Sequence, residues 1–151
     1  MEGRCLCGAV AFEIHGPATA IELCHCVRCR AASGSAFAAT FWVKATDFAW
    51  LRGLELVAVF DLPVREKPPA YRQCFCRVCG SPLPIARDGA QFVEIPAGLI
   101  AGDCGSRLID QIHVNQKAPW WNLDHSLPSY DAGPPRDVRM QMLRALKLDR
   151  K

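Results

Sequence analysis

Short stretches in which apolar and polar residues alternate recur along the chain, and they predict a fold made mostly of β-strands. Between residues 9 and 15, Val10, Phe12 and Ile14 occupy every second position, so they would share one face of a strand. A Gly-Pro pair follows, which is typical of a strand end. Other stretches with alternating, β-branched or aromatic residues predict strands at 35–44, 54–62, 71–75, 91–98 and 108–114.

Helix signals are few, and the strongest lies at the C-terminal end. The stretch 134–148 begins with two prolines and continues with good helix formers. Its apolar residues Val138, Met142 and Leu146 recur every four positions. We therefore predict a short amphipathic helix here, and one helical turn over 30–32.

Length and composition favour a single β-rich domain over residues 1–151, with a proline-rich connecting loop at 63–70. Half of the residues are hydrophobic, which is enough for a core without disulfides. The net charge is +3, and the basic and acidic residues are interspersed along the chain, so no nucleic-acid partner is expected. No apolar run approaches the ~20 residues of a membrane-spanning helix, and the N-terminus lacks a secretion signal pattern. We therefore expect no membrane association and a cytoplasmic location.

Nine cysteines are unusual in a chain of this size, and eight of them fall into three tight groups. An odd number cannot all form internal disulfides, and a reducing cytosol disfavours such bonds. Thiols one or two residues apart are typical of metal sites. The ninth, Cys104, is isolated and fits a loop or packing role. The grouped residues are Cys5 and Cys7, then Cys24, Cys26 and Cys29, then Cys74, Cys76 and Cys79.

Cysteines from the first and last groups predict a closed zinc site. In an extended segment Cys5 and Cys7 project to the same side, so both can bind one metal. Cys76 and Cys79 form a C-x-x-C knuckle, and Gly80 after it suits a turn with positive φ. Four thiolates make the tetrahedral arrangement of structural zinc. Such a site would join segments about 70 residues apart.

The middle group, Cys24, Cys26 and Cys29, leaves one of the four zinc positions free. Catalytic zinc sites keep such a position for water or substrate, and zinc deprotonates a bound thiol near neutral pH. His25 is an alternative fourth ligand, although its place between two ligands directs its side chain away. Cys74 is an alternative ligand for either site, and a spare thiol near the metal is the favoured interpretation.

Six motifs, in order over roughly residues 3–131, carry a family pattern. With them the chain resembles the glutathione-dependent formaldehyde-activating enzyme family, which also includes centromere protein V. The first three motifs are together highly specific, and a tail over 132–151 lies outside the resemblance. The motifs are GRCLCGAVAFE, CHCVRCRAASGSAF, FCRVCGSPL, IPAG, IHVNQKAPWW and LPSYD.

The resemblance implies two packed antiparallel sheets in a tent-like arrangement stabilised by zinc. The implied activity is condensation of glutathione with formaldehyde to S-hydroxymethylglutathione, with carbon–sulfur lyase activity in reverse. It also implies two zinc ions. Because a three-thiolate site can lose its zinc and oxidise, partial occupancy is expected at the second site. The implied ligands are Cys5, Cys7, Cys76 and Cys79 for a structural zinc, and Cys24, Cys26 and Cys29 for a catalytic zinc.

The substrate implied by the resemblance is a small-molecule thiol such as glutathione, whose two carboxylates would suit cations near the second zinc. Arg28, Arg30, Lys117 and Trp120 are the predicted substrate-binding residues. The alternative from another class of protein is a non-catalytic, zinc-stabilised binding module, which the centromere relatives make credible. An open fourth position at the second zinc would favour the enzyme, and full closure by protein ligands would favour the module.

Overall fold

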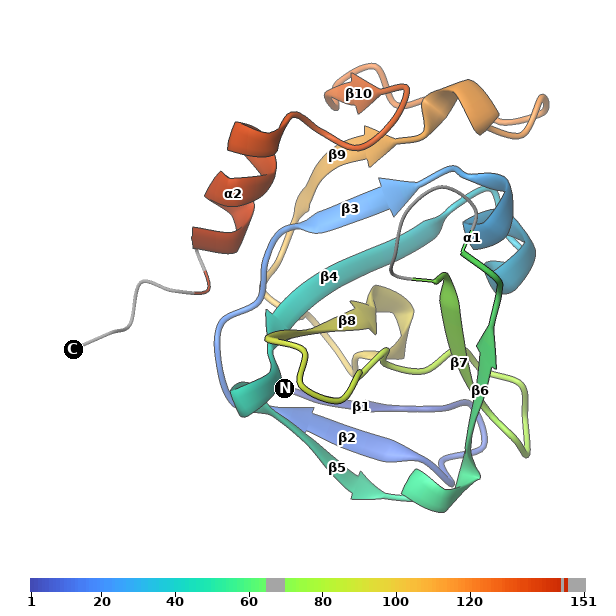
Figure 1. The fold of residues 1–151 in the computed structure, drawn as a ribbon, viewed down its shortest axis with the longest axis vertical. Coiled ribbons are helices and arrows are strands. Elements are labelled where there is room, and N and C mark those ends of the chain that lie inside the picture. Colours follow the sequence, from blue (N-terminus) through green and yellow to red (C-terminus); the bar gives the residue numbers. More distant parts are fainter. Residues whose placement is uncertain (65–69, 145, 147–151) are drawn as a thin grey trace.

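A computed structural model describes residues 1–64, 70–144 and 146, and this part forms ten β-strands in three sheets with two α-helices (Figure 1). The β-rich character and the C-terminal helix predicted from the sequence are confirmed. Among the described residues, no helix is long and apolar enough to cross a membrane.

The largest sheet has five strands and is mixed. Its members are β3 (Ile21–Cys24), β4 (Ala38–Lys44), β8 (Phe92–Pro96), β9 (Leu108–Ile112) and β10 (Ser129–Tyr130). They lie in the order β10-β9-β3-β4-β8. Strand β9 pairs in parallel with both β3 and β10, whereas β4 pairs antiparallel with β3 and β8.

Two smaller antiparallel sheets complete the fold. One contains β1 (Glu2–Arg4), β2 (Ala11–Ile14) and β5 (Phe48–Arg52), and the other contains β6 (Val57–Asp61) and β7 (Arg72–Cys76). The expectation of two antiparallel sheets is therefore wrong in two respects. The described part of the chain forms three sheets, and β9 runs parallel to both of its neighbours. Alternation along a strand tells which side chains share a face, but it does not tell which strand lies beside it or in which direction.

Several element boundaries differ from the predicted ones for local reasons. The stretch predicted as a strand over 54–62 begins with a 3₁₀ turn, Leu54–Leu56, and only then becomes β6. The predicted strand 108–114 ends at Ile112, because His113 has a left-handed φ of 54°. Strands β1, β3, β5 and β10 were not predicted. Of the predicted loop 63–70, residues 65–69 lie outside the described part.

The main core lies between the three-stranded and the five-stranded sheet. Phe12 and Ile14 of β2 pack with Phe41 of β4 and Ile95 of β8, and all four are buried. Gly3 allows β1 to lie against this core, because a Cβ there would overlap the Phe12 ring. The opposite face of the five-stranded sheet carries the polar residues Glu22, Thr40 and Glu94, and the C-terminal helix and the cavity described below lie on that side.

Helix α1 (Val27–Ser33) begins within the cysteine motif that follows the end of β3, and it contains Cys29. It is longer than the predicted turn over 30–32, because Cys26 acts as its N-cap: the Cys26 sulfur accepts a hydrogen bond from the backbone N–H of Cys29. Gly34 ends the helix in the left-handed conformation, where glycine is favoured. The chain therefore reverses tightly from β3 to β4.

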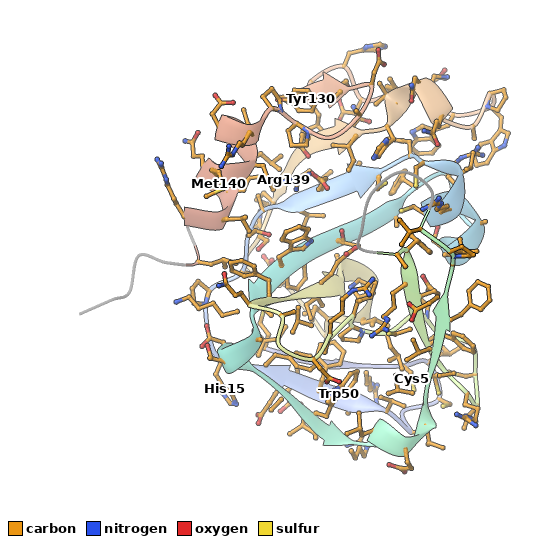
Figure 2. All side chains as sticks on the ribbon, in the orientation of Figure 1. Cys5, His15, Trp50, Tyr130, Arg139 and Met140 are labelled. Carbon is orange, nitrogen blue, oxygen red and sulfur yellow. The ribbon has the colours of Figure 1, made fainter. Side chains whose placement is uncertain are left out.

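Helix α2 (Arg136–Arg144) lies beside the five-stranded sheet (Figure 1), and its Arg139 contacts residues of β3 and β4. Of the predicted apolar positions, Met142 and Leu146 are buried. Arg139 lies between the helix and the sheet (Figure 2), where its guanidinium is 2.6 Å from a carboxylate oxygen of Glu22 and lies over the Trp42 ring. An ion pair and a cation–π contact thus hold the helix in place.

Asp110 on β9 makes the stability of the protein pH-dependent. It is paired in register with Glu22 and is almost fully buried, and burial, together with the Glu22 charge, raises its pKa to about 6. The folded state therefore binds this proton more tightly than the unfolded chain. Stability from this group is complete below about pH 4 and is lost as the pH rises past 6, by at most about 3 kcal/mol.

We expect Asp110→Asn to remove this dependence. Denaturant unfolding between pH 4 and 7 should show wild-type stability falling with pH more steeply than that of the variant, because asparagine does not ionise. Glu22 also has a pKa raised by burial, so some slope should remain in the variant. Parallel curves for the two proteins would contradict the assignment.

Candidate metal centres and the adjoining cavity

The first cysteine group consists of Cys5, Cys7, Cys76 and Cys79, whose sulfur atoms all lie within 4.8 Å of one another. The Cys5 and Cys7 sulfurs are 3.5 Å apart, and those of Cys7 and Cys76 are 3.9 Å apart. A tetrahedron with Zn–S bonds of about 2.3 Å has sulfur separations of about 3.8 Å. The donor set therefore fits zinc in chemistry and in spacing.

Local backbone structure positions these four sulfurs. Cys5 and Cys7 lie in the turn between β1 and β2, and Cys76 ends β7. The knuckle closes as predicted: the N–H of Gly80 donates to the Cys76 carbonyl at 2.8 Å, and Gly80 has a φ of 74°. The Ser81 hydroxyl and backbone lower the pKa of Cys79 to about 5, which favours the thiolate that a metal binds.

Cys74 lies beside this group without joining it. Its side chain is buried with Cys5, Val10 and Leu83, and burial raises its pKa. Its sulfur is not among the four that converge. This placement agrees with the interpretation of Cys74 as a spare thiol. Cys104 lies apart from both cysteine groups and packs against the main core.

The second cysteine group consists of Cys24, Cys26 and Cys29, whose sulfurs also lie within 4.8 Å of one another. Cys24 ends β3, Cys26 caps α1 and Cys29 lies in its first turn. Thiols this close cannot all ionise unaided: hydrogen bonds among them lower the pKa of Cys26 to about 2 and raise that of Cys24 to about 12. Three thiolates here therefore require a bound cation, and three sulfurs suit zinc.

One contact from a distant part of the chain and one buried residue of the motif itself support this cysteine loop. The side-chain oxygen of Gln116 accepts a hydrogen bond from the N–H of Val27 at 3.2 Å. His25 is fully buried beneath the loop, with its ring edge-on to Phe37 at 5.5 Å. Burial lowers the pKa of His25, and its nitrogens are not within the three-sulfur group. The expectation that His25 points away from the metal agrees with this geometry.

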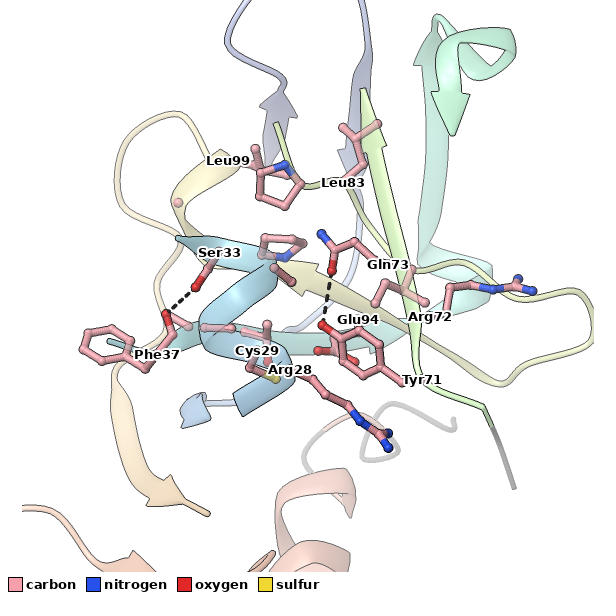
Figure 3. Close-up of a pocket in the computed structure, with 18 of the residues that line it drawn as sticks. Arg28, Cys29, Ser33, Phe37, Tyr71, Arg72, Gln73, Leu83, Glu94 and Leu99 are labelled. Carbon is pink, nitrogen blue, oxygen red and sulfur yellow. Dashed lines mark hydrogen bonds between the residues drawn. The ribbon is translucent and has the colours of Figure 1, made fainter. Parts of the chain in front are cut away.

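A cavity of about 790 Å³ adjoins the second group, and Cys29 is part of its wall (Figure 3). The volume is within the range of sites that hold a small molecule of tripeptide size. Helix α1, strands β4, β7 and β8 and the segment after the knuckle enclose it. Its charged and polar lining residues include Arg28, Ser33, Ser35, Thr40, Tyr71, Arg72, Gln73, Arg87 and Glu94; aromatic lining comes from Phe37, Trp42 and Phe92.

Of the four predicted substrate-binding residues, one lines the cavity and three lie elsewhere. Arg28 lines the cavity, with its guanidinium over the Tyr71 ring at 5.8 Å. Arg30, Lys117 and Trp120 do not line it. Lys117 donates to the Trp121 carbonyl at 3.1 Å, and Trp120 is 71% exposed.

Trp121, which sequence reasoning passed over, packs against Phe37 of the cavity wall. The two ring centroids are 5.3 Å apart. Trp121 is half-buried, whereas its sequence neighbour Trp120 is exposed and meets the Trp121 ring edge-on. An apolar residue in a loop gives no periodic signal that would distinguish the half-buried Trp121 from the exposed Trp120.

The two other arginines of the cavity are held by protein groups. Arg72 makes two hydrogen bonds with the Asp61 carboxylate, at 2.9 and 2.8 Å. Arg87 donates to the Ala70 carbonyl at 2.7 Å. Arg28 is the third arginine of the cavity. Within the described part of the chain, its guanidinium makes no hydrogen bond to another protein group.

Glu94 and Tyr71 are cavity residues that sequence reasoning missed. Tyr71 donates a hydrogen bond to the Gln73 side chain at 3.3 Å (Figure 3), and burial raises its pKa, as do the nearby thiolates of the second cysteine group. Glu94 lies between Val93 and Ile95, which point into the core. The sequence feature that could have indicated Glu94 is a single acidic residue inside an otherwise apolar strand.

Comparisons with known proteins agree with this geometry. The model of the family described as glutathione-dependent formaldehyde-activating enzyme matches residues 1–117. A search among curated proteins finds no match. A crystal structure of a Rhodobacter sphaeroides protein shares the fold, with 23% identity, a TM-score of 0.53, and coverage of 68% of this chain and 90% of that one. Because the family match spans most of the chain and includes both cysteine groups, the protein belongs to the glutathione-dependent formaldehyde-activating enzyme family.

Proposed function

We propose that this protein catalyses the addition of a small-molecule thiol to an aldehyde and the reverse cleavage, with glutathione and formaldehyde as the first substrates to test. The observation that carries the proposal is the position of the second cysteine group: its three sulfurs leave a fourth zinc position, and Cys29 belongs to the wall of a large cavity. A purely structural metal site has no need of such access.

The chain's own residues would position the substrate. A zinc ion held by Cys24, Cys26 and Cys29 would, when bound, lower the pKa of a substrate thiol. Arg28 lies at the cavity wall without a described hydrogen bond, so it is placed to pair with a substrate carboxylate. The aromatic wall, which includes Phe37, would exclude water from the reacting sulfur.

Binding experiments on the zinc-loaded protein test the proposal. We expect two zinc ions per chain, calorimetric binding of glutathione, and much weaker binding of S-methylglutathione, whose sulfur cannot become a thiolate. Exchange NMR with ¹³C-formaldehyde should then show adduct formation faster than the uncatalysed rate. A protein that holds two zinc ions but neither binds the thiol nor accelerates exchange would be the non-catalytic binding module instead.

A further inference from the structure

We propose that Glu94 is the catalytic acid–base group of this cavity, carrying one proton between the substrate thiol and the aldehyde oxygen. This inference rests on the proposed function. It also accounts for a feature that the fold alone does not explain, namely a carboxyl group on the cavity side of a strand whose neighbouring side chains are core residues.

Strand register places Glu94 at the cavity. On β8, Val93 and Ile95 point into the core, so Glu94 points to the opposite face of the sheet. It pairs with Trp42 of β4, which also lines the cavity. Cys29 lines the same cavity, and Figure 3 shows the side chains of Glu94, Tyr71 and Cys29 at one end of it.

The Glu94 side chain is half-buried, and its neighbours among the described residues include the Thr40 hydroxyl but no paired positive charge. Within the described part of the chain Glu94 takes part in no ion pair. A half-buried acid without a paired charge still loses part of its hydration, so a position that keeps one is a candidate for function. Glutamine or an apolar residue would fit the strand at lower cost.

The surroundings of Glu94 adjust its proton affinity. Burial raises its pKa, against the opposing effect of the Thr40 hydroxyl and of the Arg139 and Arg87 guanidinium groups; a thiolate at Cys26 raises it further. Tyr71 is the other titratable group close by, and its own pKa responds to the charge on Glu94. A carboxyl with a raised pKa is a stronger base when ionised, and it can return the proton that it has accepted.

The proposed proton transfer balances without another reactant. In the addition direction, the Glu94 carboxylate takes the proton of the incoming thiol. The sulfur then forms a bond to the aldehyde carbon, the C=O π pair moves to oxygen, and that oxygen takes the proton from Glu94. In cleavage, Glu94 removes the hydroxyl proton as the carbon–sulfur bond breaks, and it returns the proton to the departing sulfur. Nothing is oxidised or reduced.

Glu94→Gln tests the proposal, because glutamine keeps the size of the side chain and cannot carry the proton. The matched control is Glu55→Gln, an exposed glutamate away from the cavity. We expect Glu94→Gln to keep two zinc ions and glutathione affinity while kcat for cleavage falls about 100-fold or more. Wild type and Glu55→Gln should lose cleavage rate below the pKa of Glu94, and that limb of the pH profile should be absent in Glu94→Gln. Glu94→Asp should recover part of kcat.

A readout independent of turnover is ¹³C NMR of the zinc-loaded protein labelled at glutamate carboxyl carbons. One resonance should titrate above the ordinary range, disappear in Glu94→Gln and shift when glutathione is added. The role of Glu94 would be overturned if kcat and the pH profile were unchanged in Glu94→Gln. It would also be overturned if this variant lost zinc or glutathione binding while kcat was retained. Absence of turnover in wild type and in Glu55→Gln alike would instead refute the proposed function.

Discussion

Cys76→Ser is expected to leave the chain unfolded at 25 °C. The Cys76 side chain is fully buried at the end of β7, and its sulfur lies 3.9 Å from that of Cys7 in the turn between β1 and β2. A structural zinc in peptides contributes about 10–16 kcal/mol to folding, as much as or more than the whole stability of a typical domain. Zinc analysis and circular dichroism should show loss of the first metal together with loss of cooperative unfolding.

The neighbouring Cys74→Ser is the control for that variant. Cys74 is on the same strand, is 3% exposed and packs in the same cluster, yet its sulfur is outside the four-sulfur group. Burying a hydroxyl there should cost about 1–3 kcal/mol while both zinc ions stay bound. If the two variants unfold alike, or if Cys74→Ser also loses a zinc ion, the assignment of the first site is wrong.

Cys26→Ser is expected to abolish catalysis while the fold is retained. Cys26 is both a member of the second cysteine group and the N-cap of α1, and serine is among the best N-cap residues. The helix should therefore remain, and the thermal midpoint should change by no more than a few degrees. Zinc content should fall from two ions to one, and adduct formation should return to the uncatalysed rate.

Cys104→Ser provides the comparison for this second variant, because Cys104 belongs to neither cysteine group. It should keep two zinc ions and full activity. Activity retained in Cys26→Ser with one zinc ion bound would contradict the proposed function. Unfolding of Cys26→Ser as complete as that of Cys76→Ser would contradict the division into a structural and a catalytic site.

The cysteine groups could be predicted from the sequence because short spacings constrain geometry locally. A C-x-x-C knuckle followed by Gly80 forms the same turn wherever the chain places it, and the structure has that turn. The pairing of β3 with β9 could not be predicted in this way. The two strands are far apart in the sequence, and their parallel contact depends on the path of everything between them.

The cavity was harder to predict than the metal sites because its wall is assembled from many elements. Arg28 could be named because it lies inside a cysteine motif. Glu94 could not be named, since strand alternation shows that it faces away from the core but not that a cavity lies on that side. Lys117 and Trp120 were chosen from a motif, which gives a position in the chain but no side-chain direction.

Strand β7 serves both the first cysteine group and the cavity, since Cys74 and Cys76 face the buried cluster whereas Gln73 lines the cavity. A slip of one residue against β6 would exchange these two sets of side chains. A metal ion bound at Cys76 would prevent that slip, and it would thereby fix which side chains of β7 face the cavity. Engineering of the cavity through β7 should therefore alter Gln73 and leave the chain length between β6 and Cys76 untouched.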